Sequence, residues 1–417
     1  IGAGFGGLAC ALGLHRAEAA LTIIDQRNFH LFQPLLYQVA TAPLSPADIG
    51  MPIRRILQRQ RNARVILGRV EGIDRRSRTL RLSGGHQEFT YDYLVIATGA
   101  RHAYFGHEDW EPFAPGLKLI EDATAIRSRV LRAFEKAEAE TDPDERRRLI
   151  SFVVIGAGPT GVEMAGAIAE LAKAELAMPY RRLHGQRARI VLVEAGPQIL
   201  PAFPLSLAVK AARSLAGLGV EVRTGQKVEG CDALGILAAG QRIEARTLIW
   251  AAGVQASAAA RWLGVQADHA GRVPVGPDLS LREDPDIFVI GDTATVPWRH
   301  GKSVPGIAPA AKQQGAYVAD LLLRRLAAAD APRAFRYRHQ GDLATIGRRS
   351  AVLSFGPVHL SGWFAWLLWG AVHIFFLIGF RNRLMVTLNW LWAYCTHTHG
   401  AGLITAAADP MGALEER

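Results

Sequence analysis

Ser151-Phe-Val-Val-Ile155 followed directly by Gly156-Ala-Gly158-Pro-Thr160-Gly161-Val-Glu163 is the stretch that decides the fold of this chain. The first five residues are mostly β-branched or aromatic and predict a buried strand, whereas residues 162–173 are rich in Ala, Glu and Leu and predict a helix. Between them the glycines have the spacing G-x-G-x-x-G. The first permits a tight turn, the second lets the backbone approach a pyrophosphate, and the third lets the helix lie close to the sheet.

A second copy of the pattern stands at the start of the chain, Gly2-Ala-Gly4-Phe5-Gly6-Gly7, and runs into a helix-like stretch. Each copy is followed by a strand that ends in an acid, Asp25 after the first and Glu194 after the second. A carboxylate there binds the adenosine ribose hydroxyls and repels a 2′-phosphate. Two complete patterns about 150 residues apart predict two dinucleotides in one chain, whereas a simple NAD-dependent enzyme needs only one.

Composition limits the partners that need to be considered. With 417 residues, 49% of them hydrophobic, the chain is expected to form two or three domains with sizeable cores. Lys and Arg number 48 against 38 Asp and Glu, which gives a net charge of +10 and a pI near 9.8. Such an excess suits an anionic membrane surface, an anionic substrate or nucleic acid. We expect no nucleic-acid partner, because neither a recognition module nor a Lys-rich run is present.

The cysteines and histidines do not form a metal-binding pattern. Cys10, Cys231 and Cys395 are far apart and no C-x-x-C occurs, which excludes a thioredoxin-type dithiol and a four-Cys metal site. His397 and His399 give a weak metal signal that fits an ordinary loop better, so no metal is expected. The chain begins without Met at what should be the last residue of a first strand, so we expect the natural protein to begin earlier.

Further elements are expected along the chain. Thr98 and Gly99 end one expected strand, and small residues there are what a cofactor lying over the carboxyl edge of a sheet requires. Residues 27–40 are apolar and aromatic, and they could wall a flat cofactor ring or form an ordinary packed loop and helix. Strands are expected over 63–67, 79–82, 89–99, 189–194, 220–223, 247–253 and 286–290, helices over 123–139 and 308–325, and a linker over 141–145.

The tail carries an uncharged apolar stretch over residues 362–380, which is long enough to span a bilayer. Three Trp residues gather near one end and two Arg residues follow the other, and residues 384–394 predict an interfacial helix. Three alternatives are open: a monotopic anchor that dips into one leaflet, a single span, and a buried dimer interface. We favour the monotopic anchor and expect His373 to be a packed or pore-edge histidine.

Taken in order, the two glycine patterns, Ala97-Thr98-Gly99 and Gly291-Asp292 resemble the two-dinucleotide flavoprotein fold of the disulfide reductases. Residues 32–41, 159–163, 250–254 and 311–319 are similar to type II NADH dehydrogenases, which are single-chain NADH:quinone oxidoreductases. The resemblance implies an α/β fold with two Rossmann-like dinucleotide-binding domains and a C-terminal membrane-anchoring helical region. It further implies an FAD-binding domain over 1–116 and 270–328, an NADH-binding domain over 117–269, and a C-terminal anchoring and dimerisation region over 329–417.

The resemblance also implies roles for individual residues. The FAD-binding set would be Gly2, Gly4, Phe5, Gly6, Gly7, Asp25, Gln26, Thr98, Gly99, Gly291, Asp292 and Ala310, the last at a helix N-terminus that favours the reduced, anionic flavin. The NADH-binding set would be Gly156, Gly158, Thr160, Gly161, Glu163, Glu194, Ala252 and Gly253.

Three residues are the catalytic candidates. Glu163 would lie close to the stacked rings, or would only complement the dipole at a helix start. Many family members carry Gln where this chain has Pro309, so a quinone contact falls to Gln313 or Gln314, which could equally be ordinary polar helix positions.

The implied activity is oxidation of NADH through FAD and two-electron reduction of a membrane quinone in a respiratory chain. Proton pumping is not expected, because the chain lacks iron–sulfur spacing and proton-channel helices. The implied state is a homodimer bound peripherally to the lipid surface on the cytoplasmic face of the inner membrane. Two alternatives are a sulfide:quinone oxidoreductase, which would need cysteines near the flavin, and a redox-sensing protein like apoptosis-inducing factor, against which the Trp-rich tail argues.

Overall fold

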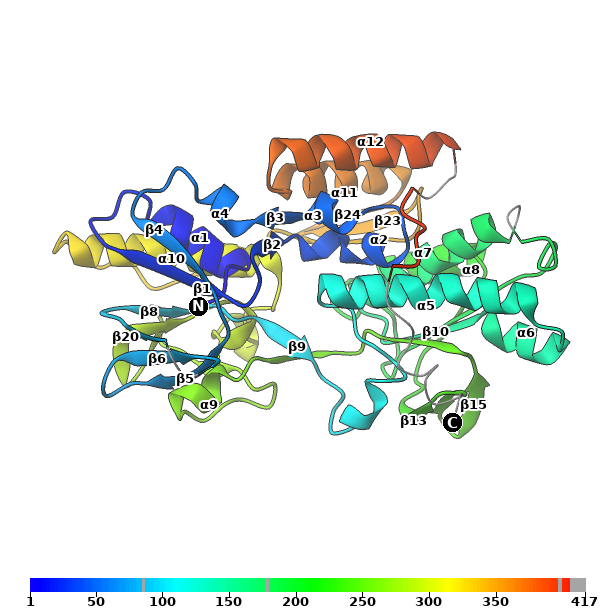
Figure 1. Ribbon diagram of the computed structural model, residues 1–417, viewed down its shortest axis with the longest axis horizontal. Coiled ribbons are helices and arrows are strands. Elements are labelled where there is room, and N and C mark those ends of the chain that lie inside the picture. The colour runs from blue at the N-terminus through cyan, green and yellow to red at the C-terminus, as the bar shows by residue number, and fades with distance from the viewer. Residues whose placement is uncertain (85–86, 177–179, 397–399, 406–417) are drawn as a thin grey trace. The chain divides into compact units, whose positions relative to one another are not determined.

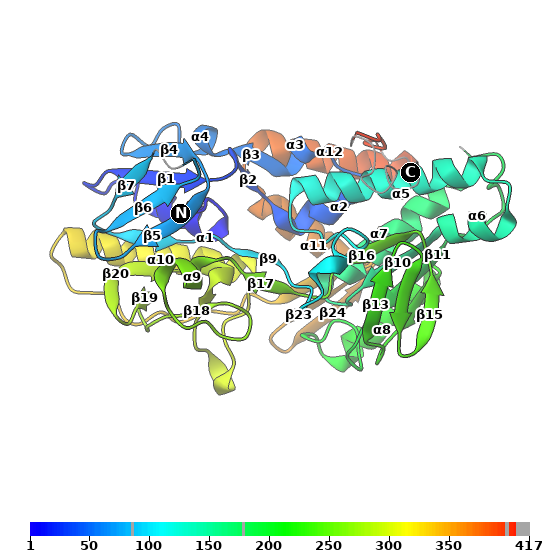
Figure 2. The same ribbon diagram turned by 60° about the horizontal axis from the view of Figure 1, so that its bottom comes forward.

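The computed structural model describes residues 1–84, 87–176, 180–396 and 400–405, and packing divides the chain into two compact units. The first unit comprises residues 1–31, 50–101 and 254–340, and the second comprises 32–49, 102–253 and 341–417. Figures 1 and 2 show the elements of each unit. The division into FAD-binding, NADH-binding and C-terminal regions stays a prediction, because these units are defined by packing alone.

The first unit is built on parallel strand pairs covered by two helices. Strand β1 (Leu21–Asp25) pairs with β4 (Ala63–Leu67), and β8 (Leu94–Ile96) pairs with β20 (Asp284–Val289), both in parallel. Helices α1 (Phe5–Gly13) and α10 (Ala308–Leu326) pack against each other (Figure 1). The aliphatic and aromatic side chains of these strands and helices form one buried core. This strand–helix alternation is the α/β arrangement expected from the glycine patterns.

A second sheet of the first unit corrects one prediction. The single strand expected over 89–99 is wrong, because residues 91–93 turn and divide it into β7 (Glu88–Thr90) and β8. Strand β7 pairs antiparallel with β6 (Thr79–Leu82), which also pairs with β5 (Val70–Asp74). The N–H of Tyr91 donates to the Arg78 carbonyl at 3.1 Å, which extends the pairing of β6 and β7 by one residue before the chain bends away to β8.

The second unit contains the strand quoted first. Strand β10 (Ser151–Ile155) is buried at all five positions and lies inside a parallel sheet of order β12–β11–β10–β16. Its neighbours are β11 (Arg189–Val193), β12 (Val220–Arg223) and β16 (Thr247–Trp250). Helices α5 (Ile120–Ala139), α7 (Pro159–Glu175) and α8 (Leu205–Gly217) accompany the sheet, and an antiparallel sheet is formed by β13 (Val228–Asp232), β14 (Gly235–Ala238) and β15 (Gln241–Glu244) (Figure 2).

Two segments that are distant in the sequence from this sheet pack against the helices beside it. The segment 32–49 forms the 3₁₀-helix η1 (Gln33–Leu35), α2 (Leu36–Ala40) and α3 (Pro46–Ile49), and α2 contacts both α5 and α7. The C-terminal region forms an antiparallel sheet of β22 (Asp342–Thr345), β23 (Ala351–Phe355) and β24 (Val358–Gly362), and β22 contacts α7.

The apolar tail forms two helices, α11 (Trp363–Phe376) and α12 (Phe380–Thr396), so the stretch over 362–380 is divided instead of forming one helix. The break lies at Leu377, which is extended, and at Gly379, whose φ is +90°. Arg383 stabilises the break, because its guanidinium donates to the carbonyls of Phe375 and Leu377 at 2.9 and 2.8 Å. Among the described residues, we find no helix that combines the length and the apolar character needed to cross a membrane.

The remaining helices and strands are short. They are β2 (Phe29–Leu31), β3 (Gly50–Pro52), α4 (Ile53–Ile56), β9 (Ala100–His102), η2 (Glu108–Trp110), β17 (Val254–Ala256), α9 (Ala259–Leu263), β18 (Val273–Pro274), β19 (Ser280–Leu281), η3 (Gly291–Thr293), β21 (Ala294–Thr295) and η4 (Arg299–Gly301).

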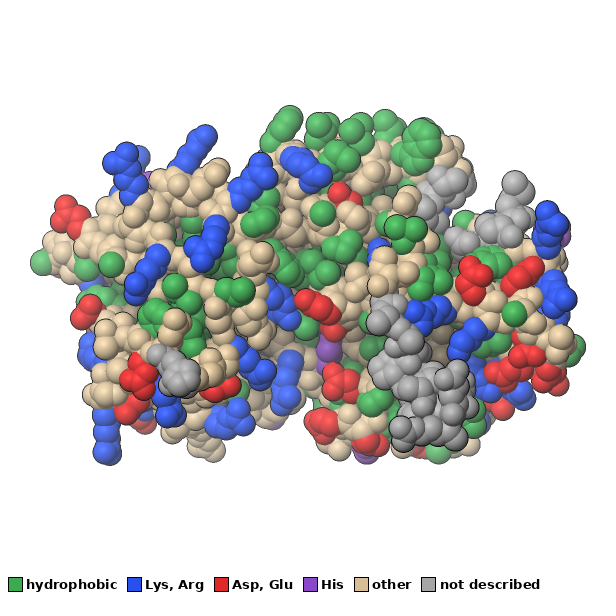
Figure 3. Space-filling view, in the orientation of Figure 1, with side chains coloured by type: hydrophobic (Ala, Val, Ile, Leu, Met, Phe, Trp, Pro, Cys, Tyr) green, Lys and Arg blue, Asp and Glu red, His purple; other side chains and the backbone are tan. Residues whose placement is uncertain are grey.

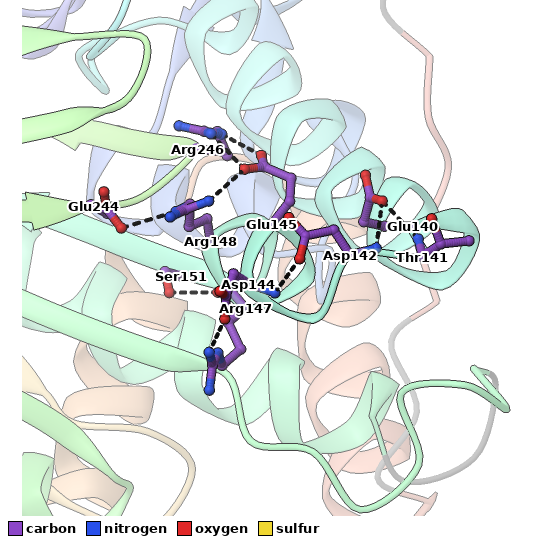
Figure 4. Close-up of polar contacts among 10 residues, drawn as sticks. All are labelled: Glu140, Thr141, Asp142, Asp144, Glu145, Arg147, Arg148, Ser151, Glu244 and Arg246. Atoms are coloured by element: carbon purple, nitrogen blue, oxygen red, sulfur yellow. Dashed lines mark hydrogen bonds and ion pairs between the residues drawn. The ribbon is translucent and has the colours of Figure 1, made fainter.

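The linker predicted over 141–145 is in part a helix, α6 (Pro143–Leu149). The side chain of Asp142 accepts a hydrogen bond from the first turn and Pro143 stands at the helix start, which together fix the N-terminus. The carboxylate of Glu145 accepts two hydrogen bonds from Arg246, both at 2.6 Å, and Arg148 contacts Glu145 and Glu244 (Figure 4). The hydrogen bond from Arg246 lowers the pKa of Glu145.

We expect Glu145→Gln to lower the free energy of unfolding by about 1 kcal/mol, because it removes the charge from a half-buried, two-bond contact with Arg246. Since the folded-state pKa is depressed, the difference from wild type should be present at neutral pH and shrink below about pH 4.3. Urea unfolding measures it. Asp320→Asn, in an exposed pair with Arg324, is the matched control and should change stability by less than about 0.5 kcal/mol. An equal effect of both variants would contradict this assignment.

Candidate functional site

The two glycine loops have the same geometry, one in each unit. Gly2 and Gly156 have φ values of +90° and +96°, which L side chains rarely adopt. A Cβ on Gly7 would lie 1.8 Å from the Gly2 carbonyl oxygen, and a Cβ on Gly161 would lie 1.8 Å from that of Gly156. The third glycine of each pattern therefore lets a helix backbone touch the carbonyl of the first.

The second glycine of each loop faces open space. Gly4 and Gly158 precede α1 and α7, and a Cβ on either would meet no atom within 4 Å. Neither residue caps its helix with a side chain, so N–H groups of both first turns can bind an anion. The loops therefore fit the pyrophosphate groups of two dinucleotides.

Asp25 and Glu194, the predicted ribose-binding acids, each accept hydrogen bonds from the backbone of their own glycine loop and of the segment that follows the acid. The N–H groups of Ala3 and Ala157 donate to Asp25 Oδ2 and Glu194 Oε2, each at 2.7 Å. The second oxygens accept from the N–H groups of Arg27 at 2.8 Å and Gly196 at 2.7 Å, respectively. A carboxylate has about four acceptor sites, so each can still bind ribose hydroxyls. Sequence reasoning missed this second, structural role.

The other predicted FAD-binding residues of the first unit converge on the loop of residues 2–7. A Cβ on Gly2 would lie 2.4 Å from the Ala97 carbonyl oxygen, immediately before Thr98 and Gly99. A Cβ on Gly6 would lie 3.2 Å from Ile290, next to Gly291 and Asp292, and 3.2 Å from the Ala311 carbonyl oxygen in the first turn of α10. In the same set Ala310 is buried, Gln26 is exposed, and the Phe5 ring lies edge-on to His30 at 5.1 Å.

Two hydroxyl residues of this region were not predicted. The hydroxyls of Thr98 and Ser257 are 2.6 Å apart, and Thr293 Oγ1 donates to the Gly99 carbonyl at 3.2 Å. Ser257 lies 159 residues from Thr98, and nothing near it in the sequence indicates this contact.

Gln313 and Gln314 both bind backbone groups of the first unit. Gln314 is buried, and its Oε1 accepts from the N–H of Gly291 at 2.6 Å. Gln313 accepts from the N–H of Arg338 at 3.0 Å and donates to its carbonyl at 2.9 Å. Helix α10 begins at Ala308 with Pro309 in its first turn, as predicted. A quinone contact by either glutamine stays a prediction.

A pocket in the second unit brings α7 together with the segment 32–49. It is lined by Gln33, Pro34, Leu36, Tyr37, Leu117, Lys118, Thr160 and Glu163. Glu163 is buried, and its Oε1 accepts from the N–H of Thr345 at 3.3 Å. Burial raises the pKa of Glu163 to about 8, so the side chain is mostly uncharged at pH 7. Ala252 lies beside the glycine loop that precedes α7, because a Cβ on Gly156 would be 2.4 Å from the Ala252 Cα. Gly253 is the next residue.

Cys10, Cys231 and His373 are packed residues, whereas Cys395 is exposed. Cys10 and Cys231 are buried, and burial raises the pKa of each thiol to about 12. His373 Nδ1 lies 2.7 Å from the Trp369 carbonyl, and burial lowers the pKa of the ring to about 4. In the described ranges no three His, Cys, Asp or Glu side chains gather as a metal site would require, and His397 and His399 lie outside those ranges.

Comparisons with known proteins agree on one family. The model for pyridine nucleotide-disulphide oxidoreductases matches residues 1–315, and that for the NDH2 C-terminal domain matches 339–396. The chain is 43% identical to the type II NADH:quinone oxidoreductase Ndh of Mycobacterium tuberculosis, over 97% of this chain and 89% of that protein. It is 42% identical to NdhA of the same organism, over 97% and 88%.

Solved structures show the same fold. NDH2 from Plasmodium falciparum in complex with NADH matches 95% of this chain and 97% of that one, with a TM-score of 0.87 and 20% identity. The sulfide:quinone oxidoreductase from Aquifex aeolicus matches with a TM-score of 0.70 and 20% identity, over 95% of both chains.

We expect Glu194→Gln to weaken the preference for NADH over NADPH, because the variant loses the charge that repels a 2′-phosphate. It keeps one oxygen that can accept from Ala157 or Gly196, so the loop should persist. The ratio of dissociation constants for the two nucleotides should shift toward NADPH by about tenfold, equivalent to 1.4 kcal/mol. Glu221→Gln, on the neighbouring strand β12 and paired with Arg189, is the control. An unchanged ratio in Glu194→Gln would rule out the role given to this carboxylate.

Proposed function

The chain belongs to the type II NADH:quinone oxidoreductases, and on this premise we propose that it oxidises NADH and reduces a membrane quinone with FAD as its cofactor. The observation that carries the proposal is the pair of equivalent glycine loops, each with an open helix N-terminus and a carboxylate on its own N–H group. One such loop would serve a dehydrogenase, whereas two suit a flavoprotein that also binds a nicotinamide nucleotide.

We assign the two cofactors to the two loops. Residues 2–7, Asp25, Thr98, Gly99, Gly291, Asp292 and Ala310 would hold FAD, and residues 156–161, Glu163, Glu194, Ala252 and Gly253 would hold NADH. FAD, when bound, supplies the two-electron chemistry that links a hydride donor to a quinone. The protein supplies binding and orientation, and the N-terminus of α10 favours negative charge at its end.

Direct mixing tests the function. Addition of NADH to the purified protein should bleach the flavin absorbance, and subsequent addition of a soluble quinone should restore it. Bleaching without restoration would favour the redox-sensing alternative, and a protein without flavin would end the proposal.

Glu163 is proposed as a proton-holding residue of the NADH site. Its carboxyl is uncharged at neutral pH, so it makes little charge–dipole interaction with α7 there, and a role limited to the helix start is disfavoured. It lies in the same pocket as Thr160, which stands in the phosphate-binding loop. Ionisation would place a negative charge beside the position of the bound nucleotide.

We therefore expect kcat/KM for NADH to fall as pH rises through about 8, because the pKa of Glu163 is raised to about 8 and the anionic form dominates above it. Glu163→Gln should remove this fall, and Glu170→Gln, two turns further along α7, should retain it. A pH profile with NADH and ferricyanide as acceptor measures the effect. The same fall in Glu163→Gln would assign the titration to another group.

We assign the binding sites for the quinone and for the lipid surface to α11 and α12. Figure 3 shows hydrophobic side chains gathered over α12. An exposed apolar patch of this kind marks a membrane or protein contact. We propose monotopic attachment to the cytoplasmic face of the inner membrane, and a homodimer, which light scattering would test. The exposed residues are Trp363, Phe364, Leu367, Leu368, Phe375, Phe380, Leu384, Leu388, Leu391 and Trp392.

We expect Phe364→Glu and Phe380→Glu each to weaken binding to anionic lipid vesicles by at least about tenfold, because each removes a large apolar contact and adds a negative charge. Activity with ferricyanide should stay unchanged. Leu234→Glu, at an exposed apolar residue in the turn before β14, is the control and should bind vesicles as wild type does. If the two Phe variants bound vesicles normally but became monomeric, the patch would be a dimer interface instead.

A further inference from the structure

A hydrogen-bonded chain of three side chains leads from α12 to the pocket of the second unit. Trp390 Nε1 donates to Gln38 Oε1 at 2.7 Å, and Gln38 Nε2 donates to the Tyr37 hydroxyl oxygen at 2.8 Å. Tyr37 and Gln38 are both buried in α2. Asn389 supports the same contact, because its amide donates to Asp48 Oδ2 of α3 at 3.2 Å.

The direction of this chain is fixed by the indole. The N–H of Trp390 can only donate, so the Gln38 atom that it contacts must be the carbonyl oxygen. The other end of the Gln38 amide is then the NH₂ group, which also can only donate. The Tyr37 oxygen therefore accepts, and its own O–H proton must be directed elsewhere.

The pocket is where the Tyr37 O–H proton can be directed. Among the described residues, no protein acceptor is in hydrogen-bond contact with the Tyr37 O–H. Tyr37 lines the pocket together with Thr160 and Glu163, and Pro34 and Leu117 form other parts of the pocket wall. Burial raises the pKa of Tyr37 well above its ordinary value, and the nearby Glu163 carboxyl raises it further, so the hydroxyl keeps its proton.

We propose that Tyr37 is a hydrogen-bond donor to a carbonyl oxygen of the bound substrate, and that Gln38 and Trp390 are positioning residues that direct its proton into the pocket. The inference rests on the proposed function and adds a binding residue to the same site. A carbonyl fits because it is acceptor-only and because both substrates carry one: the nicotinamide carboxamide of NADH and the quinone ring. Through Trp390, the membrane-facing helix α12 would then determine that Tyr37 donates a hydrogen bond to the substrate instead of accepting one.

Steady-state kinetics of the purified holoenzyme tests the proposal in two arms. One arm measures KM for NADH with ferricyanide as acceptor, and the other measures KM for a short-chain ubiquinone at saturating NADH. Tyr37→Phe should raise KM roughly three- to tenfold in one arm, with kcat changed less, because one neutral hydrogen bond is lost. A rise in the NADH arm identifies the carboxamide, and a rise in the quinone arm identifies the quinone carbonyl.

The positioning residues give a second test. Trp390→Phe frees the Gln38 amide to turn, so KM should rise in the same arm by a smaller factor. The double variant should match Tyr37→Phe, because Trp390 acts only through the hydroxyl that is already absent, whereas independent structural effects would add. Trp262→Phe, the same replacement on α9 of the first unit at a residue assigned to no site, is the matched control and should match wild type.

Three outcomes would overturn the proposal. The first is wild-type KM values in both arms for Tyr37→Phe, and the second is additive effects in the double variant. The third is a Tyr37→Phe variant that shifts the pH profile of Glu163 without changing KM, because the Glu163 carboxyl would then be the acceptor. Flavin content and melting temperature identify a variant that fails to fold, and Trp390→Phe, which leaves the pocket lining intact, then decides. Failure of the proposed function is distinct, because it would show as wild-type protein without NADH:quinone activity.

Discussion

Both nucleotide loops depend on the contact between a helix backbone and the carbonyl of the first loop glycine. A Cβ on Gly7 would lie 1.8 Å from the Gly2 carbonyl oxygen, and a Cβ on Gly161 would lie 1.8 Å from the Gly156 carbonyl oxygen, so neither position has room for a side chain. Any side chain there would push the helix from the strand, and the N–H groups of α1 and α7 would no longer face the same place as the acid that ends the next strand. The anion site, the carboxylate–loop bonds and the close helix packing all follow from this one allowance.

In the second unit helix α7 also contacts the C-terminal region. Glu163 and Glu170, two turns apart on α7, accept backbone N–H groups from Thr345 at 3.3 Å and Arg348 at 2.7 Å. The Arg348 guanidinium then donates to the Ala393 carbonyl of α12 at 2.9 Å. The apolar surface proposed to bind lipid is thus connected by direct polar contacts to the helix proposed to bind NADH. Burial raises the pKa of both carboxyls, and Arg348 Nε lies 3.7 Å from Glu170 Oε2.

Several elements were predictable from the sequence to the residue, among them β1, β4, β6, β10 and β12. Strands β1, β4 and β10 are mostly apolar, and β6 and β12 alternate apolar and polar residues, so the signal lies within each element itself. The errors came where a local signal was overridden. Residues 91–93 interrupt an apolar run because β7 and β8 join different sheets, and residues 143–149 form a helix because Asp142 caps it and Arg246, far along the chain, pairs with Glu145.

The sequence by itself determined the two dinucleotide loops and the acids that complete them, because glycine spacing and strand ends act over a few residues of one chain segment. Only the tertiary structure decided the protonation of Glu163 and the direction of the Tyr37 hydroxyl. The bond between Trp390 and Gln38 joins residues 352 positions apart, and that between Thr345 and Glu163 joins residues 182 apart. Desolvation and hydrogen-bond polarity depend on every group packed around a side chain, so they are set by the assembled unit and not by local pattern.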